Sequence, residues 1–490
     1  MGLEGAKLEL EVEMKAVREY YKSGKTREES WRRAQLLGLA KLLEEREGEI
    51  YMAIKEDLGK HHVEAYRDEI GVLVKGVDVA LRSLKHWMSP TRAKLPFIAY
   101  PTTAHTVPEP LGLILVISSW NLPFGLSIEP VIGAVAAGNA VVIKPSELSP
   151  ASSALLAKLI PIYLDPQAVK VVPGDAQVGQ QLLDLKWDKI LFTGSPKVGQ
   201  IVMAAAAKHL TPVCLELGGK CPAVFDHLSS SWDKKTAVNR LLAAKFGSCA
   251  GQACIAVDYA LVEKKHVSEL VDLLKAKIKE MFGDNPRELN TVARIVNKHN
   301  FSRLRKLMGD PSVKSTIVHG GSFDEHNLFI EPTIMVDPPL ESSLMTEEIF
   351  GPFLPIITLD KIEDSIEFIK ARPRPLAIYA FTNDDKLKKR ILSETSSGSV
   401  TFNDAIVQYI AETLPFGGVG ESGFGRYHGK FTFEMFSHEK AVMSRGFLID
   451  FWFRFPPWND HKLNLFKVAY RLDVIGIVLT VLGLKKSKIN

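Results

Sequence analysis

The stretch Leu-Ile-Leu-Val-Ile-Ser at residues 113–118 opens a series of five short apolar, β-branched segments that decides the fold. The other four lie at residues 140–143, 169–172, 189–192 and 212–215. Amphipathic stretches with helical spacing separate them, and Gly138-Asn139 ends the first stretch with a pair typical of helix C-caps. Strands that alternate with helices predict βαβ units in a parallel sheet.

A second alternating series follows and predicts a second α/β domain. Two helices are expected between its strands, at residues 266–281 and 363–370. The segments expected as strands are residues 221–225, 255–262, 330–336, 354–359, 376–382 and 399–403. The length of 490 residues is too great for one ordinary core and agrees with two or three domains.

The chain before residue 113 divides into a helical part and an extended part. Residues 11–87 carry apolar stripes at helical spacing, and Thr26 with Glu29 predicts a capping box at the start of one helix. Residues 95–107 contain or border on Pro96, Pro101 and Pro108, which favour a protruding hairpin or a linker between domains.

Composition excludes several classes of protein. A net charge of +4 gives no indication of a nucleic-acid partner. Four cysteines are too few for a disulfide framework at this length, which indicates a reducing compartment, and their spacing favours no structural metal. The first 21 residues contain five glutamates and no apolar core, so neither a secretory signal nor a transit peptide is expected and a cytoplasmic location is predicted.

Polar residues stand at the carboxyl ends of the predicted strands, where parallel sheets bind ligands. Gly194, followed by the N-cap pair Ser195-Pro196, suits a pyrophosphate at a helix start. Lys144 and Glu147 suit the hydroxyls of a ribose. Ordinary capping and turn chemistry explains each position equally well when it is taken alone.

The stretch Phe-Gly-Ser-Cys-Ala-Gly-Gln-Ala-Cys-Ile at residues 246–255 presents Cys254 among small residues. Space around the thiol and backbone N–H groups facing it favour a reactive nucleophile. An inert buried cysteine beside glycine and alanine is the alternative interpretation.

Residues 418–423 match the dinucleotide pattern GxGxxG, but no apolar strand precedes them and no acidic residue follows at the expected distance. We therefore expect a flexible loop near an active site rather than the cradle of a cofactor.

Seven motifs, in the same order, resemble the NAD(P)-dependent aldehyde dehydrogenases, specifically their class 3 branch of fatty and aromatic aldehyde enzymes. The similarity extends from about residue 11 to residue 457. The motifs lie at residues 120–124, 144–147, 192–195, 215–220, 251–254, 347–352 and 414–418.

The resemblance implies a three-part organisation of this α/β fold. A Rossmann-type domain with a parallel sheet would bind the cofactor and comprise residues 1–91 and 111–215. A second α/β domain, residues 216–404, would be catalytic. Residues 92–110 and 405–450 would form a bridging region for oligomerisation, with a homodimer as the usual outcome, and residues 451–490 would be a C-terminal tail.

The resemblance also implies the chemistry of aldehyde detoxification. Cys254 would attack the aldehyde to give a thiohemiacetal and then a thioester, and the side-chain amide of Asn121 with the backbone N–H of Cys254 would form the oxyanion hole. Glu216 would activate the water that releases the carboxylic acid. The expected substrates are medium- or long-chain aliphatic or aromatic aldehydes.

The same resemblance implies NAD as the cofactor, with NADP also accepted. Glu348 would hold the nicotinamide ribose with Phe350 packed beside it, and Lys144 and Glu147 would hold the adenosine ribose. The carboxylate of Glu147 should repel a 2′-phosphate. The remaining residues expected to contact the cofactor are Trp120, Gly194, Ser195 and Gly199.

Two further points follow from comparison with the family pattern. The family usually has asparagine five residues before the nucleophile, where this chain has Cys249. Oxidation could join Cys249 to Cys254 and stop activity, whereas the alternative is a small buried thiol. A cysteine hydrolase or acyltransferase that uses Cys254 without a cofactor is the other enzyme class to consider, and it would need a histidine beside the thiol.

Residues 474–484 form an apolar run interrupted by Thr480 and followed by Lys485, Lys486 and Lys488. Eleven residues are too few to cross a bilayer, which needs about twenty. The run could lie in a membrane interface with its lysines at anionic headgroups, or it could pack against protein.

Overall fold

The computed structural model describes residues 3–286, 291–471 and 473–481, and it divides into two compact units. Unit 1 comprises Met1–Lys85 and Pro110–Ser437. Unit 2 comprises His86–Glu109 and His438–Asn490. The predicted catalytic domain lies within unit 1, and so does the predicted cofactor domain except for its residues 86–91, which belong to unit 2. The predicted boundary between the two domains at residues 215 and 216 stays a prediction.

The first sheet of unit 1 has six strands in the order β17-β7-β6-β3-β4-β5. All are parallel except β17, which runs antiparallel to β7. Strand β3 lies between β4 and β6. Strands β4 and β5 are added on one side of β3, and β6 and β7 are added later on its other side. This reversal of strand order makes a switch point at the carboxyl ends of β3 and β6. The strands are β3 (Leu113–Ile117), β4 (Ala140–Lys144), β5 (Val169–Val171), β6 (Lys189–Gly194), β7 (Val213–Leu217) and β17 (Gly423–Phe424).

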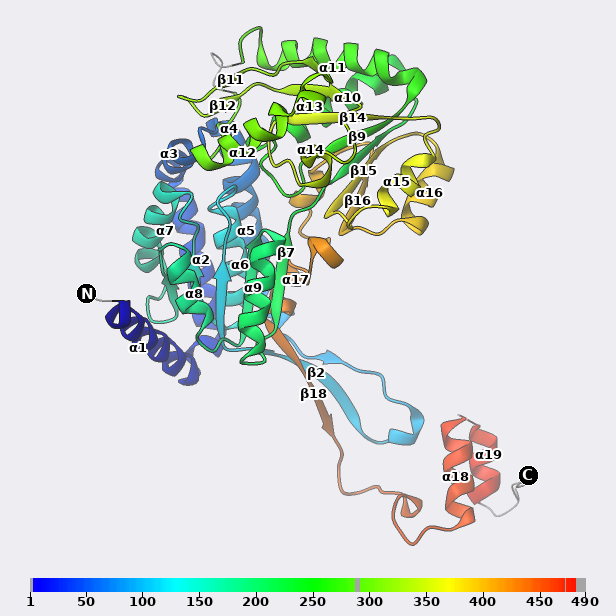
Figure 1. Ribbon diagram of the computed structural model, residues 1–490. Coiled ribbons are helices and arrows are strands. Elements are labelled where there is room, and N and C mark those ends of the chain that lie inside the picture. Colours follow the sequence, from blue (N-terminus) through cyan, green and yellow to red (C-terminus); the bar gives the residue numbers. More distant parts are fainter. Residues whose placement is uncertain (1–2, 287–290, 472, 482–490) are drawn as a thin grey trace. The chain divides into compact units, whose positions relative to one another are not determined.

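Helices cover both faces of this sheet, as Figure 1 shows. Helix α6 (Gly125–Ala137) is buried along its whole length, which agrees with its nearly continuous apolar sequence. It ends at Gly138, which has φ +91° and therefore adopts the left-handed conformation that the C-cap pattern predicts. The other helices of this half are α1 (Leu3–Lys22), α2 (Glu29–Glu45), α3 (Glu47–Leu58), α4 (His62–Ala65), α5 (Gly71–Met88), α7 (Pro150–Tyr163), α8 (Ala176–Leu183) and α9 (Pro196–Ala207).

The second sheet of unit 1 has seven strands in the order β10-β13-β14-β9-β8-β15-β16, with only β10 antiparallel to its neighbour. The strands are β8 (Pro222–Phe225), β9 (Tyr259–Glu263), β10 (Ile317–His319), β13 (Thr333–Val336), β14 (Phe353–Leu359), β15 (Ala377–Phe381) and β16 (Ser399–Phe402). Its helices are α10 (Ser231–Phe246), α11 (Val267–Phe282), α12 (Lys298–Gly309), α13 (Pro311–Lys314), α14 (Ser343–Thr346), α15 (Asp364–Lys370) and α16 (Asp385–Glu394). Helix α17 (Lys430–Met435) packs against α6. Two parallel α/β sheets therefore confirm the predicted fold class.

Unit 2 contains a three-stranded sheet in the order β1-β2-β18 and two C-terminal helices. Strand β18 stands at one edge of this sheet, and most of its residues are exposed. The elements are β1 (Thr91–Arg92), β2 (Thr103–Pro110), β18 (Ser437–Ser444), α18 (Asp460–Tyr470) and α19 (Val474–Val481). The extended hairpin expected at residues 95–107 is thus present as β1 and β2, which pair antiparallel.

Only part of the apolar run at residues 474–484 can be described, because residues 482–490 lie outside the described residues. Its first eight residues form α19, which packs against α18. Within the part of the chain that the structure describes, no helix is both long and apolar enough to span a bilayer.

Three local expectations are wrong. The capping box at Thr26 is absent, because Thr26 lies inside a short 3₁₀ turn, and α2 begins at Glu29 without a side-chain cap. The strand expected at residues 330–336 is broken at Pro332, which lacks the N–H that a strand interior needs. The strand expected from residue 255 begins only at Tyr259, because the residues after Cys254 form a turn.

Candidate active site

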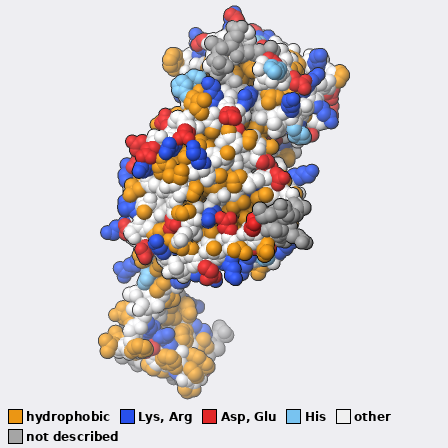
Figure 2. All heavy atoms as spheres, turned by 90° about the vertical axis from the view of Figure 1, so that its left-hand side faces the viewer, with side chains coloured by type: hydrophobic (Ala, Val, Ile, Leu, Met, Phe, Trp, Pro, Cys, Tyr) orange, Lys and Arg blue, Asp and Glu red, His pale blue; other side chains and the backbone are white. Residues whose placement is uncertain are grey.

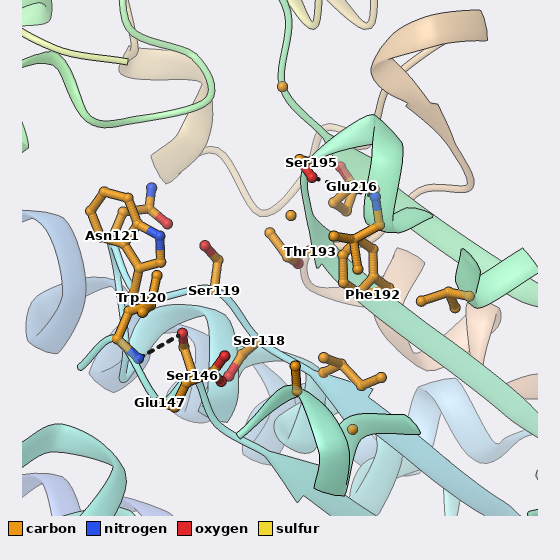
Figure 3. Close-up of a pocket in the computed structure, with 18 of the residues that line it drawn as sticks. Ser118, Ser119, Trp120, Asn121, Ser146, Glu147, Phe192, Thr193, Ser195 and Glu216 are labelled. Atoms are coloured by element: carbon orange, nitrogen blue, oxygen red, sulfur yellow. Dashed lines mark hydrogen bonds between the residues drawn. The ribbon is translucent and has the colours of Figure 1, made fainter. Parts of the chain in front are cut away.

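A cavity of about 590 Å³ opens at the carboxyl ends of β3, β4, β6 and β7, at the switch point of the first sheet. In the close-up of this pocket, Trp120 and Asn121 lie on one side and Thr193, Ser195 and Glu216 on the other (Figure 3). Ten of the predicted site residues line the cavity: Trp120, Asn121, Lys144, Glu147, Gly194, Ser195, Glu216, Cys254, Glu348 and Phe350.

Gly199 does not line this cavity. It lies in α9, where a Cβ would stand 3.0 Å from the side chain of Leu217 and 3.4 Å from that of Leu215. The absence of a side chain therefore lets α9 approach β7 closely, and a role of Gly199 in cofactor binding stays a prediction.

The turn between β6 and α9 combines a bare backbone with a helix start. A Cβ at Gly194 would lie 2.5 Å from the ring of Phe192, so only glycine leaves this edge open. Ser195 caps α9, its Oγ accepting a hydrogen bond from the N–H of Val198 at 3.4 Å, and Pro196 occupies the first turn. The N–H groups and dipole of a helix start favour an anion such as a pyrophosphate at this place.

Lys144 and Glu147 form an ion pair where β4 ends. Nζ of Lys144 donates to Oε2 of Glu147 at 2.5 Å. The lysine side chain is 5% exposed and that of the glutamate 40%, so the cation stands at the base of the cavity and the carboxylate at its rim. This arrangement offers a donor and an acceptor to the hydroxyls of one ribose.

The loop that leads to Cys254 has an unusual backbone. Cys249, Ala250 and Gly251 have φ values of +49°, +52° and +78°, in the left-handed region that non-glycine residues rarely adopt. A Cβ at Gly251 would lie 2.5 Å from the backbone oxygen of Gly351, which only glycine permits. Backbone strain of this kind persists only where the surroundings hold it, and it is frequent at active sites.

The thiol of Cys254 lines the cavity and faces the backbone N–H groups of Cys254 and Ile255. Burial, followed by the carboxylates of Glu348 and Glu216, nevertheless raises the pKa of Cys254 to about 12. Backbone N–H groups therefore face the thiol as expected, but burial and the two carboxylates favour its protonated form in the protein without cofactor.

Cys249 is fully buried and packs with Leu58 and Val296. Its N–H donates to Oε1 of Glu64 at 2.6 Å. This burial favours the interpretation of Cys249 as a small buried thiol over the hypothesis of a redox pair with Cys254.

Glu216 projects from β7 into the cavity and is 3% exposed. Its Oε1 accepts a hydrogen bond from the thiol of Cys214, and its buried Oε2 has no partner among the described residues. Burial raises the pKa of Glu216 well above its usual value, the Cys214 thiol acting in the opposite direction. A carboxyl group with a raised pKa and a free oxygen is suited to act as a general base near neutral pH.

Glu348 and Phe350 approach the same cavity from the second sheet. Oε1 of Glu348 accepts a hydrogen bond from the N–H of Gly219 at 3.1 Å, and a Cβ at Gly218 would collide with its carboxylate. Burial raises the pKa of Glu348 to about 8. Phe350 packs edge to face against Trp120, with ring centroids 5.5 Å apart, which joins the two halves of the cavity wall.

The wall also contains residues outside the predicted set, among them Asn300 and Arg303, which lie on α12. The guanidinium of Arg303 donates to the backbone oxygens of Glu348 at 3.3 Å and Ile349 at 2.5 Å, so it fixes the segment that carries Glu348. The spacing of three residues, which places both on one helix face, was the available signal.

The residues around the cavity also bear on the alternative enzyme class. No histidine is among the lining residues, so this wall lacks the base that the cofactor-independent hydrolase was expected to need. Among the described residues, no group of histidine, cysteine, aspartate and glutamate side chains could hold a metal ion.

Comparison with known proteins decides the family, because residues 4–442 match the model of the aldehyde dehydrogenase family. The chain belongs to this family. Aldehyde dehydrogenase family 3 member F1 of Arabidopsis thaliana is 53% identical over 99% of this chain and 100% of that protein. Aldehyde dehydrogenase family 3 member A2 of Rattus norvegicus is 40% identical over 93% of each chain.

Solved structures agree with this assignment. The substrate-bound state of AldH from Staphylococcus aureus is 37% identical, with a TM-score of 0.91 over 94% of this chain and 99% of that chain. This aldehyde dehydrogenase therefore oxidises aldehydes to carboxylic acids with NAD(P), and its similarity to family 3 members confirms the resemblance seen in its motifs. Nothing in the comparisons supports the hydrolase alternative.

Proposed function

We propose that Cys254, Asn121 and Glu216 carry out the oxidation in the cavity at the switch point, with Glu348, Phe350, Lys144 and Glu147 holding the cofactor. One observation carries this assignment. All seven residues, drawn from both sheets of unit 1, line the same cavity.

In the first step, the thiolate of Cys254 attacks the aldehyde carbon and forms a tetrahedral thiohemiacetal. The side-chain amide of Asn121 and the backbone N–H of Cys254 donate hydrogen bonds to the oxygen that becomes negatively charged. Because such donors are fixed in place before the reaction, each stabilises the transition state by far more than a hydrogen bond to water.

A bound NAD(P) would supply the acceptor for the hydride that the thiohemiacetal loses as it becomes a thioester, and its positive nicotinamide would favour the thiolate of Cys254. The residues that fit such a ring are Glu348, whose buried carboxylate suits a ribose hydroxyl, and Phe350 with Trp120, whose rings form one wall. Gly194 and the start of α9 suit the pyrophosphate, since no side chain blocks that edge.

In the last step, Glu216 accepts a proton from water, and the resulting hydroxide attacks the thioester carbon. The carbon–sulfur bond breaks, the carboxylic acid leaves and Cys254 recovers its thiolate. The unpartnered Oε2 of Glu216 is available to accept this proton.

NAD is the proposed cofactor, with NADP accepted less well. The carboxylate of Glu147 stands at the rim beside Lys144 and would repel a 2′-phosphate on the adenosine ribose.

The proposed substrates are medium- and long-chain aliphatic or aromatic aldehydes. Cys254 packs against the large apolar cluster of the second sheet, so one side of the nucleophile is apolar. Apolar walls beside the nucleophile favour apolar substrates. A series of aldehydes from two to sixteen carbons is expected to show kcat/KM rising with length, and a preference for the shortest member would contradict this assignment.

A homodimer is the proposed assembly. Strand β18 is an eight-residue edge strand with most residues exposed, and such an edge can pair with another chain. Light scattering should give twice the mass of the chain, and proline at Val442 should reduce it to the monomer mass.

We propose that the protein is cytoplasmic and that its unit 2 contacts an intracellular membrane. Hydrophobic side chains cover much of the visible surface of this unit (Figure 2), and its strongly exposed members include Phe447, Leu448, Trp458, Tyr470 and Ile475. Exposed aromatic and aliphatic residues favour a membrane interface. Vesicles of neutral and anionic lipids should sediment the full chain more completely than a chain that ends at Arg471, which keeps the exposed side chains of residues 447–470.

The central experiment follows NADH absorbance with a medium-chain aldehyde. Cys254→Ala should abolish turnover, because no other cysteine lines the cavity. Glu216→Gln should keep a burst of one NADH per site and stall afterwards, because only release of the acid needs the base. A Cys254→Ala enzyme that still forms NADH would overturn the proposed chemistry.

A further inference from the structure

A buried network of charged side chains lies between the two loops that supply the proposed oxyanion donors. It comes from residues 60–69, around the π-helical turn η2 (Tyr66–Ile70). Its centre is the ion pair between Lys60 and Glu69, in which both side chains are 0% exposed and Nζ lies 3.0 Å from Oε1.

One side of this network holds the loop that carries Asn121. Nζ of Lys60 donates to the backbone oxygen of Asn121 at 2.8 Å. Oε2 of Glu69 accepts hydrogen bonds from the N–H groups of Phe124 and Gly125, at 2.9 and 3.1 Å. The backbone between β3 and α6 is therefore fixed at Asn121 itself and again three residues later.

The other side holds the loop that leads to Cys254. Oε1 of Glu64 accepts from the N–H of Cys249 at 2.6 Å, and Oδ2 of Asp68 accepts from the hydroxyl of Ser248 at 2.9 Å. Arg67 donates to the backbone oxygen of Gly247 at 2.7 Å. These three bonds fix the residues immediately before and within the left-handed stretch at Cys249 and Ala250, which needs external support.

The destinations of these bonds distinguish the network from ordinary packing. The network consists of Lys60, Glu64, Arg67, Asp68 and Glu69. Every side-chain hydrogen bond described for these five residues ends either within the network or on one of the two loops. A buried ion pair is a poor source of stability, since desolvation opposes it, so its retention favours a role in fixing geometry. The π-helical turn agrees, because such turns are frequent at functional sites.

The electrostatic balance keeps the pair charged. Burial alone would lower the pKa of Lys60, but the carboxylates of Glu69, Glu64 and Asp68 outweigh it and raise that pKa above its usual value. The ammonium group is therefore a permanent donor to the loop of Asn121.

We propose that Lys60, Glu64, Asp68 and Glu69 are positioning residues that hold the amide of Asn121 and the N–H of Cys254 at the spacing which the oxyanion requires. This inference rests on the proposed function. None of the four lines the cavity, so they act through the two loops rather than by touching substrate or cofactor.

The test compares two replacements of Glu64. Glu64→Gln keeps an oxygen that accepts from Cys249, while Glu64→Leu has a similar size and no acceptor. Four measurements are made on the full chain: the single-turnover rate of NADH formation, the rate at which 4-nitrophenyl acetate acylates the enzyme, the dissociation constant for NAD and the thermal midpoint.

Glu64→Leu should slow both the NADH step and acylation by about tenfold to a hundredfold, because a donor displaced by roughly 1 Å costs about that much. Its dissociation constant for NAD should stay within about twofold of wild type. Glu64→Gln should restore both rates to within about fivefold. Ser248→Ala, which removes only the hydroxyl bond to Asp68, should slow both steps by a smaller factor, and it tests the same idea if Glu64→Leu does not fold.

Asp57 offers a matched control. Its buried carboxylate also accepts hydrogen bonds from two backbone N–H groups at the start of a helix, those of Ala151 at 3.0 Å and Ser152 at 2.8 Å, but neither belongs to the two loops. Asp57→Asn should lower the thermal midpoint and leave acylation near the wild-type rate.

Three results would overturn the inference. The first is acylation of Glu64→Leu at the wild-type rate, and the second is a Glu64→Gln variant that is as slow as Glu64→Leu. The third is an Asp57→Asn variant in which acylation is slowed as much as in Glu64→Leu. If instead Cys254→Ala keeps turnover, the proposed function fails and this inference fails with it. Loss of turnover in Cys254→Ala together with a fully active Glu64→Leu contradicts the positioning role alone.

Discussion

The Sγ atom of Cys214 lies 3.7 Å from Oε1 of Glu216 and donates a hydrogen bond to it. Both residues stand on one face of β7, two positions apart, and Cys214 is fully buried. The proposed general base is therefore held by a neutral donor of its own strand, while its second oxygen stays unpartnered among the described residues. The pair predicts that the activity of the base depends on a thiol that takes no part in the reaction.

Cys214→Ala should move the rising limb of the pH profile of kcat to higher pH. A donor stabilises the carboxylate and so lowers the pKa of Glu216, against the larger effect of burial, which raises it. Since the base acts in its ionised form, a higher pKa requires a higher pH for the same rate. The measurement is kcat between pH 5.5 and 9.5 at saturating aldehyde, under conditions in which release of the acid limits turnover.

Cys214→Ser is the matched control, because a hydroxyl is a better hydrogen-bond donor than a thiol. The rising limb of its pH profile of kcat should lie at the same pH as in wild type or at a lower pH. A profile that does not move in Cys214→Ala would show that the thiol has no influence on the base.

Asn121→Ala should slow hydride transfer by about a hundredfold or more, since one donor to the developing oxyanion is lost. Asn121 is 2% exposed and its side chain lines the cavity, so the change is expected to act on the reaction and not on the surface. Stopped-flow absorbance of NADH in a single turnover measures this step directly. A rate within about threefold of wild type would exclude Asn121 from the oxyanion hole.

Much of the fold was predictable from the sequence, because a buried parallel strand leaves a compact apolar segment that stands out between helical stretches. The five segments from residue 113 to residue 215 correspond to β3–β7 within a few residues. Strand order was not predictable, since the position of β6 beside β3 depends on contacts between segments about seventy-five residues apart. The break at Pro332 was also missed, because the apolar pattern of residues 330–336 by itself predicts one continuous strand.

The candidate site was predictable where a motif marks it and not where packing creates it. Cys254, Asn121 and Glu216 lie in short motifs, and the structure places all three at one cavity. Lys60 and Glu69 lie in a part of the chain that reads only as packing helices, and nothing in their spacing indicates that both side chains are fully buried and bonded to distant loops.

Glu147→Gln should increase the use of NADP relative to NAD by about tenfold in kcat/KM, which corresponds to about 1.4 kcal/mol. Removal of the carboxylate relieves its repulsion of a 2′-phosphate, while Lys144 remains buried beside it as an attractive cation. Initial rates with each cofactor at low ionic strength provide the ratio. Glu341→Gln, at an exposed position outside the cavity, should leave that ratio unchanged, and an equally unchanged ratio in Glu147→Gln would place the ribose elsewhere.

Glu129→Gln should make the protein more stable at alkaline pH and leave its stability near pH 5 almost unchanged. Glu129 is buried within α6, where Oε1 accepts from the hydroxyl of Thr432 at 2.9 Å and Oε2 has no partner among the described residues. Burial raises the pKa of Glu129 from 4.5 to about 8, with the Thr432 hydroxyl acting in the opposite direction.

The sign of this effect follows from linkage. A carboxyl group whose folded pKa lies above its unfolded value contributes stability that is fully present below the unfolded pKa and is lost as pH rises through the folded pKa. For Glu129 the loss extends from about pH 4.5 to about pH 8 and is on the order of 5 kcal/mol. A glutamine of the same shape carries no proton to lose, so its contribution does not change over this range.

Thermal midpoints of wild type and Glu129→Gln, measured from pH 5 to pH 9, test this prediction. The two curves should coincide within about 1 °C at the acidic end and separate by roughly 2–5 °C above pH 8, with the variant higher. Exposed Glu341→Gln should follow wild type at every pH. Parallel curves for Glu129→Gln would mean that this carboxyl group is already ionised in the folded protein at pH 5. Its burial in α6, with Oε2 unpartnered among the described residues, argues against that.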